Sequence, residues 1–172
     1  FNGNNIVYRE NPEDVMIRTA RQLNAITSTK MQNVWNDPDV TFIQQLHINA
    51  ATYDWNNDGN VLNETIPVPG SIGSETKPFC ATYTGSAGYV NQAKIEGFAF
   101  ENPIFGNIGN GTRTTQTTDE TTTTTTIIQG KVEDLSILIQ GGENVTIGSS
   151  NTNYAAVLAA VSSGIIDNVD IR

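Results

Sequence analysis

Three short stretches of the chain repeat one spacing of apolar residues, at positions 95–100, 132–137 and 166–171. Each has an apolar residue, two polar or small residues, a second apolar residue, one spacer and a third apolar residue. The third position holds Gly97, Asp134 or Asn168, which are residue types that tolerate a left-handed backbone. We therefore expect a bend within or beside a short strand in each copy. Repeated short strands bury their apolar faces by stacking, so the pattern predicts a β-solenoid.

A second motif precedes two of these copies. Residues 104–108 match residues 157–161 position by position, with the small residues Gly106 and Ala159 permitting close approach of the backbone. The two units differ in the spacing to the next repeat strand, and the extra residues fall in the Thr-rich segment 110–126. We interpret this segment as an insertion projecting from a turn. It is either a disordered or glycosylated tract or an added β-ribbon built from its β-branched residues.

The N-terminal part has a helical period. Thr19 and Gln22 are spaced as a capping box, and Ala20, Leu23 and Ile26 follow at helical intervals. The pattern predicts a helix over about residues 20–31. We expect residues 1–40 to cap the strand repeats of residues 41–172, all within a single domain, because an open solenoid end exposes its core and its unpaired edges.

Further strands are predicted on either side of a polar loop. Residues 40–48 are rich in β-formers and predict one strand or a pair of short ones, with Phe42, Leu46 and Ile48 on one face. In residues 79–85, Phe79, Ala81 and Tyr83 alternate with smaller or polar residues, which predicts another strand.

Charge and composition narrow the class of partner. The 172 residues carry 18 acidic and 9 basic side chains, a formal charge of −9, and such a field disfavours nucleic acid and anionic lipid. Abundant Asn, Thr, Gly and Ser favour an all-β extracellular protein. Cys80 is the only cysteine, so no disulfide framework is expected within the chain and Cys80 is predicted to be structural. The sequence contains no apolar membrane span.

The order of these elements resembles bacterial cell-surface proteins with GLUG-type repeats. The resemblance covers roughly residues 6–171 and is carried by segments 17–23, 42–44, 54–55, 67–73, 78–85, 104–106, 130–135 and 154–171. Related segments occur in adhesins, in pilin-like surface proteins and in accessory regions of IgA-protease-type peptidases. The resemblance implies a mainly β fold, a right-handed parallel β-helix-like solenoid with a short N-terminal capping α-helix, exported to the bacterial cell surface.

The chain departs from that family at two places. Residues 157–160 stand where glycine-rich residues are usual, and the Thr-rich insertion is unusually long. A repeat strand also falls directly before Arg172. We therefore expect the natural polypeptide to continue, or neighbouring domains or subunits to cover the C-terminal end.

The polar loop contains a calcium-like pattern. Asp54, Asn56 and Asp58 provide oxygen donors at alternating positions and Gly59 follows, as in the first half of an EF-hand loop. The bidentate Glu expected at position twelve is replaced by Thr65, because Glu64 falls one residue early. The pattern is compatible with a Ca²⁺ site, but a turn rich in Asn and Asp between strands is the favoured interpretation.

Aromatic residues in the same loop suggest a sugar platform. Trp55 with its neighbours Tyr53 and Asp54 is the best candidate for binding a glycan, since an exposed ring presents an apolar face to sugar C–H groups. Packing of Trp55 against the core or the cap is nevertheless the favoured interpretation. Carboxylates fall at equivalent positions of the three repeats, at Glu96, at Glu133 and Asp134, and at Asp167. Stacked carboxylates could act as the acid and nucleophile of a glycosidase. Polar residues at outward-facing repeat positions are also expected from solubility alone. His47 has no partner at zinc spacing.

These features predict a non-catalytic extracellular adhesin or pilin-like module, which presents loops on a rigid solenoid to a host or microbial glycan or surface protein. The alternatives are an accessory domain of a secreted protease, a carbohydrate-active β-helix enzyme and a phage fibre segment. No cofactor other than Ca²⁺ is suggested.

Overall fold

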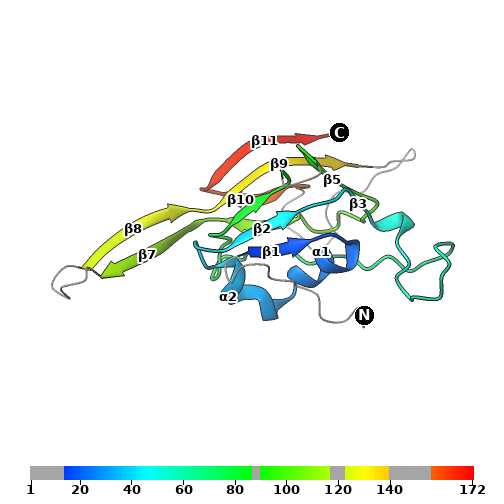
Figure 1. The fold of residues 1–172 in the computed structure, drawn as a ribbon, viewed down its shortest axis with the longest axis horizontal. Coiled ribbons are helices and arrows are strands. Elements are labelled where there is room, and N and C mark those ends of the chain that lie inside the picture. The colour runs from blue at the N-terminus through cyan, green and yellow to red at the C-terminus, as the bar shows by residue number, and fades with distance from the viewer. Residues whose placement is uncertain (1–13, 87–89, 117–122, 140–155) are drawn as a thin grey trace.

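Parallel β-strands dominate the fold (Figure 1). A computed structural model describes residues 14–86, 90–116, 123–139 and 156–172. The largest sheet contains seven strands, in the order β1-β2-β4-β9-β5-β3, with β11 on the other side of β9. The seven strands are β1 (Asp14–Ile17), β2 (Thr41–Gln44), β3 (Ile48–Asn49), β4 (Thr82–Thr84), β5 (Ala93–Glu96), β9 (Lys131–Leu138) and β11 (Ile165–Ile171).

One half of this sheet stacks an apolar residue from every strand. The registers place Val15 beside Phe42, Phe42 beside Tyr83, Tyr83 beside Val132, and Val132 beside Ile166. The first four side chains have no exposed surface. Because strands in register project equivalent side chains to the same face, the ladder builds one continuous core.

The second half of the sheet forms a similar stack. Ile48 pairs with Ile95, Ile95 with Ile137, and Ile137 with Ile171. The long strands β9 and β11 run through both halves, whereas β2 and β4 belong to the first half and β3 and β5 to the second. Residues 40–48 accordingly form the pair of short strands β2 and β3. Leu46, between them, is 43% exposed, so the expectation that it shares the inner face is wrong.

All three predicted left-handed positions have a positive φ. The angles are 78° at Gly97, 55° at Asp134 and 48° at Asn168. Asp134 and Asn168 bend β9 and β11 between the two halves of the sheet. The first copy is not equivalent to the other two, however, because Ile95 pairs with Ile137 and not with Val132. Gly97 therefore bends the chain just after β5, at a different corner.

A small parallel sheet lies across the core. It consists of β6 (Phe105–Ile108) and β10 (Ala159–Ser162), extended by single bridges from Ile72 and Phe79. Phe105 pairs with Ala159, so the match of 104–108 with 157–161 is shifted by one residue. Aromatic rings fill the space between the sheets: the Phe79 and Phe105 centroids lie 5.1 Å apart.

The Thr-rich segment forms a β-ribbon. The strands β7 (Asn110–Gln116) and β8 (Thr123–Gln129) pair antiparallel from Asn110 opposite Gln129 to Gln116 opposite Thr123. Figure 1 shows the ribbon extending away from the sheets. Of the two alternatives, the added ribbon is the one present in the described residues, as the β-branched composition allows. The tip at residues 117–122 lies outside the described part.

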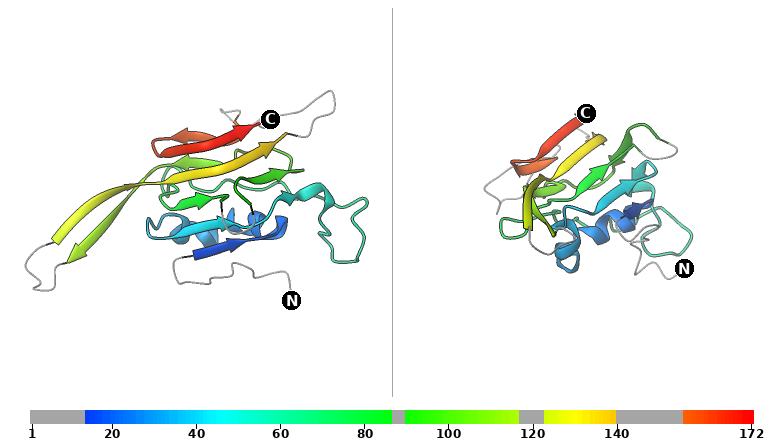
Figure 2. Two further views of the ribbon diagram at one scale, coloured as in Figure 1. Left: turned by 45° about the horizontal axis from the view of Figure 1, so that its top comes forward. Right: turned by 60° about the vertical axis from the view of Figure 1, so that its left-hand side comes forward.

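Helical residues lie beside β1 and β2 (Figure 2). They form α1 (Ala20–Ile26), η1 (Thr29–Met31) and α2 (Gln32–Trp35), and a further short turn, η2 (Ala50–Thr52), follows β3. The capping box of Thr19 and Gln22 is present, and Ala20, Leu23 and Ile26 are buried. The predicted single helix over 20–31 is interrupted because Ser28 is extended and its side chain caps η1.

Candidate functional site: an acidic loop on an aromatic base

The polar loop after η2 is folded by its own Asn and Asp side chains. Asp54 accepts hydrogen bonds from the backbone N–H of Asp58 through Oδ1 at 3.1 Å and of Gly59 through Oδ2 at 2.8 Å. Asn56 Oδ1 accepts a second bond from the Asp58 N–H at 2.8 Å. Gly59 has a φ of 83°, which supplies the tight turn that the sequence pattern predicts.

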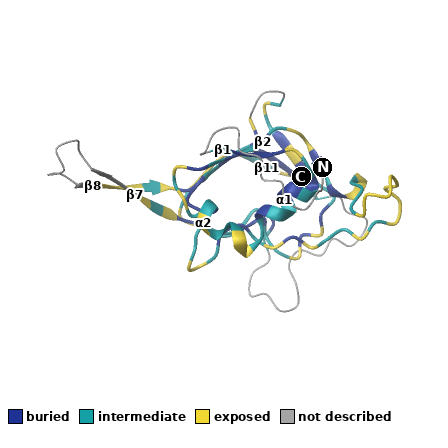
Figure 3. Ribbon diagram, turned by 60° about the horizontal axis from the view of Figure 1, so that its bottom comes forward, coloured by how far each residue is buried: buried dark blue, intermediate teal, exposed yellow. Residues whose placement is uncertain are grey.

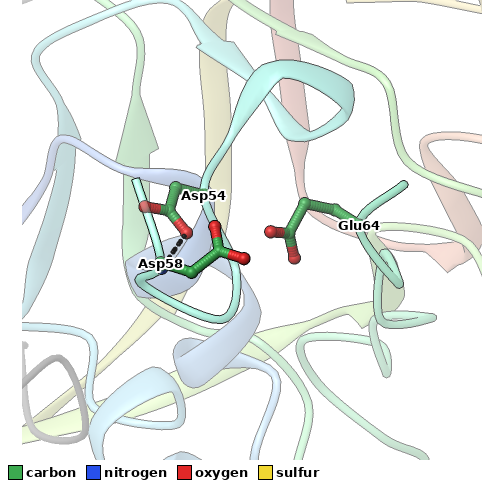
Figure 4. Close-up of side chains that lie close together, drawn as sticks. All are labelled: Asp54, Asp58 and Glu64. Atoms are coloured by element: carbon green, nitrogen blue, oxygen red, sulfur yellow. Dashed lines mark hydrogen bonds between the residues drawn. The ribbon is translucent and has the colours of Figure 1, made fainter. Parts of the chain in front are cut away.

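The loop brings three carboxylates together. Asp54, Asp58 and Glu64 each place a carboxylate oxygen within 4.8 Å of the other two. Figure 4 shows Glu64 facing Asp54 and Asp58 across a short gap. Glu64 Oε1 is buried and has no hydrogen-bond partner. Asn56, the third oxygen donor of the predicted calcium pattern, donates from Nδ2 to Asp58 Oδ2 at 3.2 Å.

Glu64 is the member of this cluster that the sequence pattern did not assign. It stands at position eleven, whereas an EF-hand loop takes its last carboxylate from position twelve. The sequence did contain a sign of this ligand, because Glu64 is an acidic residue one position before the expected one. Because this loop lacks the second helix of an EF-hand, its backbone returns along a different path and a neighbouring position can reach the cluster.

Three negative charges at this separation repel one another. Such a cluster is relieved by protonation or by a hard cation, which prefers several oxygen ligands. Asp54 and Asp58 lie on one turn, and Glu64 faces them from the segment of the loop that returns toward the sheets (Figure 4). The donor set is all oxygen, which suits Ca²⁺ better than a transition metal.

An aromatic cluster supports the base of the loop. Trp55 is partly buried against the core and donates from Nε1 to the Ala50 carbonyl at 2.9 Å. Its ring meets Tyr53 edge to face with centroids 4.9 Å apart, and Phe98 with centroids 6.3 Å apart. The two residues proposed as a sugar platform are therefore packed together, and each is only partly buried.

Arg21 ties this base to α1. Its guanidinium lies 5.7 Å from the Tyr53 ring centroid and 6.0 Å from that of Trp55. Its Nη2 donates to the carbonyl oxygens of Asp54 and Trp55. A cation over an aromatic face that also holds backbone carbonyls fixes both partners, so the start of the acidic loop is anchored to the helix.

The surroundings of this loop are mostly exposed (Figure 3). Comparison with protein-family models, with curated proteins and with solved structures found no match. None of the helices in the described part of the chain has the length and apolar character needed to cross a membrane.

The remaining candidates have structural partners. The Lys94 backbone N–H donates to His47 Nδ1 at 3.1 Å. Burial raises the pKa of the Cys80 thiol, although a hydrogen bond from Asn36 opposes the shift, so Cys80 is poorly suited to act as a nucleophile. Trp35, the second of the two tryptophans in the chain, was not among the candidates; it is buried and donates from Nε1 to the Lys77 carbonyl at 3.2 Å.

The repeat carboxylates are only partly aligned. Glu133 and Asp167 are partners in register, whereas Glu96 pairs with Leu138 and accepts a bond from Asn49 Nδ2 at 2.9 Å. The expectation that Glu96 stacks with them is wrong, because β5 joins the other half of the sheet. Glu133 also forms an ion pair with Lys131. The hydrogen bond between Lys131 and Glu133 is the main reason that the pKa of Lys131 is raised.

Proposed function

We propose that the chain is a non-catalytic module of a bacterial cell-surface protein, which presents loops on a right-handed β-helix-like shaft. The observation that supports this proposal is the parallel ladder from β1 to β11. Its four strand pairs, β1–β2, β2–β4, β4–β9 and β9–β11, all place an apolar residue beside an apolar residue at the same position. A parallel ladder built coil upon coil gives a rigid body with projecting turns. Of the predicted cap, residues 1–40, the helical residues from α1 to α2 keep that role in this proposal, whereas β1 is already part of the ladder.

The acidic loop and the ribbon are the parts suited to contact. Both project from the sheets (Figures 1 and 3), and loops held on a rigid scaffold are common binding elements. Within the loop, Trp55, Tyr53 and Asp54 combine two aromatic rings with a carboxylate. That combination suits a host or microbial glycan, because the rings stack on C–H groups while the carboxylate accepts from hydroxyls.

Glycan-array binding by the purified chain tests this proposal. We expect Trp55→Ala to abolish binding, while Leu62→Ala on the same loop, whose side chain is 72% exposed, leaves it intact. Circular dichroism must show that the Trp55 variant is folded, since the ring also packs on the core. Binding that is unchanged in a folded Trp55→Ala variant would place the ligand elsewhere, and the absence of binding across broad arrays would remove the glycan proposal.

Two other functions remain as alternatives. An accessory domain of a secreted protease could have the same β-helix-like shaft. The presence of a protease domain in the same polypeptide would identify this alternative. A phage fibre segment would trimerise in solution. A carbohydrate-active enzyme is less well supported, because Glu133 is engaged by Lys131 and the third carboxylate, Glu96, lies at another register position.

We further propose that the acidic loop binds Ca²⁺. The specific observation in its favour is that Glu64 Oε1, buried without a hydrogen-bond partner, belongs to the cluster with Asp54 and Asp58. The cation would hold the segment that carries Glu64 against the turn that carries Asp54 and Asp58. Because Asp54 and Trp55 are neighbours, calcium would also order the backbone beneath the aromatic base.

A further inference from the structure

Asp54 belongs to both parts of the candidate site. Its carboxylate is a member of the acidic cluster, and its carbonyl oxygen accepts a hydrogen bond from Arg21 Nη2 at 3.4 Å. Its two neighbours in the sequence, Tyr53 and Trp55, supply rings of the aromatic base. A cation that binds the Asp54 side chain therefore acts on a residue whose backbone is held from α1.

Arg21 is the residue of α1 that holds this backbone. Its Nη2 donates to the carbonyls of Asp54 and Trp55 and to Asn57 Oδ1 at 3.5 Å, and its guanidinium lies over the two rings. Its Nε is buried and has no hydrogen-bond partner. The hold of Arg21 on the loop therefore depends on Nη2 and on the contact with the rings.

The turn that follows Asp54 is shaped by bonds within the loop. Asp58 Oδ1 accepts from the Asn60 N–H at 2.8 Å, and Asn60 Oδ1 accepts from the Leu62 N–H at 2.9 Å. Like the bonds from Asp54 to the turn, they join residues two to five positions apart. Such bonds shape the turn but do not attach it to the helix, whereas Arg21 does.

We propose that Arg21 couples calcium binding in the acidic cluster to the conformation of the aromatic base, which makes glycan binding at Trp55 dependent on calcium. The inference rests on the two proposed sites and adds the residue that joins them. Calcium fixes Asp54, the Asp54 and Trp55 carbonyls then stay on Nη2, and the guanidinium stays over the rings. Because coupling is reciprocal, a bound glycan strengthens calcium binding by the same factor.

In this coupling Arg21 is a positioning residue, because it acts through Asp54 and the two rings. Its positive charge has a separate effect, since a cation near the cluster opposes the binding of a second cation. Loss of the charge alone should therefore strengthen calcium binding, whereas loss of the contacts should separate calcium binding from the aromatic base. The two effects are distinguished by measuring calcium binding and the state of Trp55 independently.

Tryptophan emission reports the coupling without a glycan. Calcium is titrated into the intact chain, and binding is followed by isothermal titration calorimetry and by fluorescence. We expect a saturable change in emission that follows the calorimetric binding curve. The change should be absent in Trp55→Phe, where the buried Trp35 is the only tryptophan left. An unaltered Trp35 emission maximum shows that this variant is folded.

Substitutions of Arg21 test its role. Arg21→Met keeps an apolar stem but loses the charge and the donors, so it should still bind calcium while the emission change falls about fivefold or more. Arg21→Lys keeps a cation near the rings but lacks the planar fork, so it should recover only part of the change. Lys30→Met, which removes an exposed cation from η1, should behave like the unaltered chain.

Glycan arrays probed in calcium and in EDTA connect the coupling to function. A glycan that binds through Trp55 should bind about fivefold or more weakly in EDTA. In Arg21→Met, binding should be weak in both conditions. Glycan binding through Trp55 that is equal in calcium and in EDTA would overturn the coupling while supporting the glycan site itself.

The calcium titration separates this inference from the calcium proposal. Absence of calcium binding to the unaltered chain overturns the calcium site and the coupling together. Calcium binding without a change in Trp55 emission, or with an undiminished change in Arg21→Met, overturns the coupling alone. Should Arg21→Met fail to fold by circular dichroism, Arg21→Lys decides, and a full emission change in that variant overturns the coupling.

Discussion

Asn168 donates a hydrogen bond of 2.6 Å from Nδ2 to Asp134 Oδ1, and the two residues occupy equivalent left-handed bends in β11 and β9. The bond links the paired strands β9 and β11 at the point where each turns from one half of the sheet to the other. An Asn or Asp at this point serves twice, because it tolerates the positive φ and its side chain reaches the neighbouring bend.

This relationship predicts how the bend responds to substitution. Asn168→Ala loses the hydrogen bond and puts at this positive φ a residue that tolerates the left-handed region less well than Asn, so we expect a loss of about 1–2 kcal/mol in the free energy of unfolding. Asn168→Gly loses the bond but relieves the backbone and should cost less than half as much. Urea denaturation measures both. Equal losses for Ala and Gly would show that the backbone conformation contributes nothing.

Gly130 should tolerate no side chain. A Cβ at this position, directly before β9, would lie 2.1 Å from the Phe79 carbonyl oxygen and 2.9 Å from that of Gly109. We expect Gly130→Ala to destabilise the chain by about 1–3 kcal/mol or more. Gly70→Ala is the matched control, because its Cβ would meet its nearest atom at 3.4 Å. Similar urea midpoints for the two variants would contradict the close approach of the Gly130 backbone to Phe79 and Gly109.

A buried polar pair ties the two halves of the large sheet. The Tyr83 hydroxyl donates to Gln44 Oε1 at 2.7 Å, and Gln44 Nε2 donates to the carbonyls of Leu46 and Lys94. Both side chains have no exposed surface. Tyr83→Phe leaves the Gln44 oxygen without its donor, so we expect a loss of about 1–3 kcal/mol at neutral pH.

The same pair predicts an alkaline dependence of stability. Burial raises the pKa of Tyr83 well above its usual range, so the folded state holds the phenolic proton more tightly than the unfolded state. Its contribution is complete below the unfolded pKa of about 10 and is lost as the pH rises above it. Unfolding free energies measured from pH 8 to 11 should fall more steeply for the unaltered chain than for Tyr83→Phe. Parallel curves would show that Tyr83 ionises equally in both states.

The sequence predicted local conformation better than pairing. Gly97, Asp134 and Asn168 were recognisable as left-handed positions, because that property belongs to the residue type. The pairing partner of Ile95 was not predictable in the same way, since its spacing fits either half of the sheet. Which half it joins depends on the turn that precedes β5, and the length and path of that turn are set by tertiary packing.

The acidic loop illustrates the same limit. Asp54, Asp58 and the turn at Gly59 follow from short-range pattern and are present. Glu64 was set aside because a helical loop requires its last ligand one residue later. The chain after Gly59 does not continue into a helix, and only the folded path shows which carboxylate returns to the cluster.

Calcium should therefore stabilise the chain through Glu64. At 10 mM Ca²⁺ and a dissociation constant near 1 mM, of the order seen in extracellular sites, binding adds about 1.4 kcal/mol. For a domain of this size the melting temperature should rise by about 3–6 °C relative to EDTA. Glu64→Gln should remove most of that rise and, by relieving repulsion within the cluster, should raise the melting temperature in EDTA. Glu75→Gln, at an exposed position outside the cluster, should behave like the unaltered chain. Differential scanning calorimetry gives all of these values, and an identical calcium response in both variants would exclude Glu64 as a ligand.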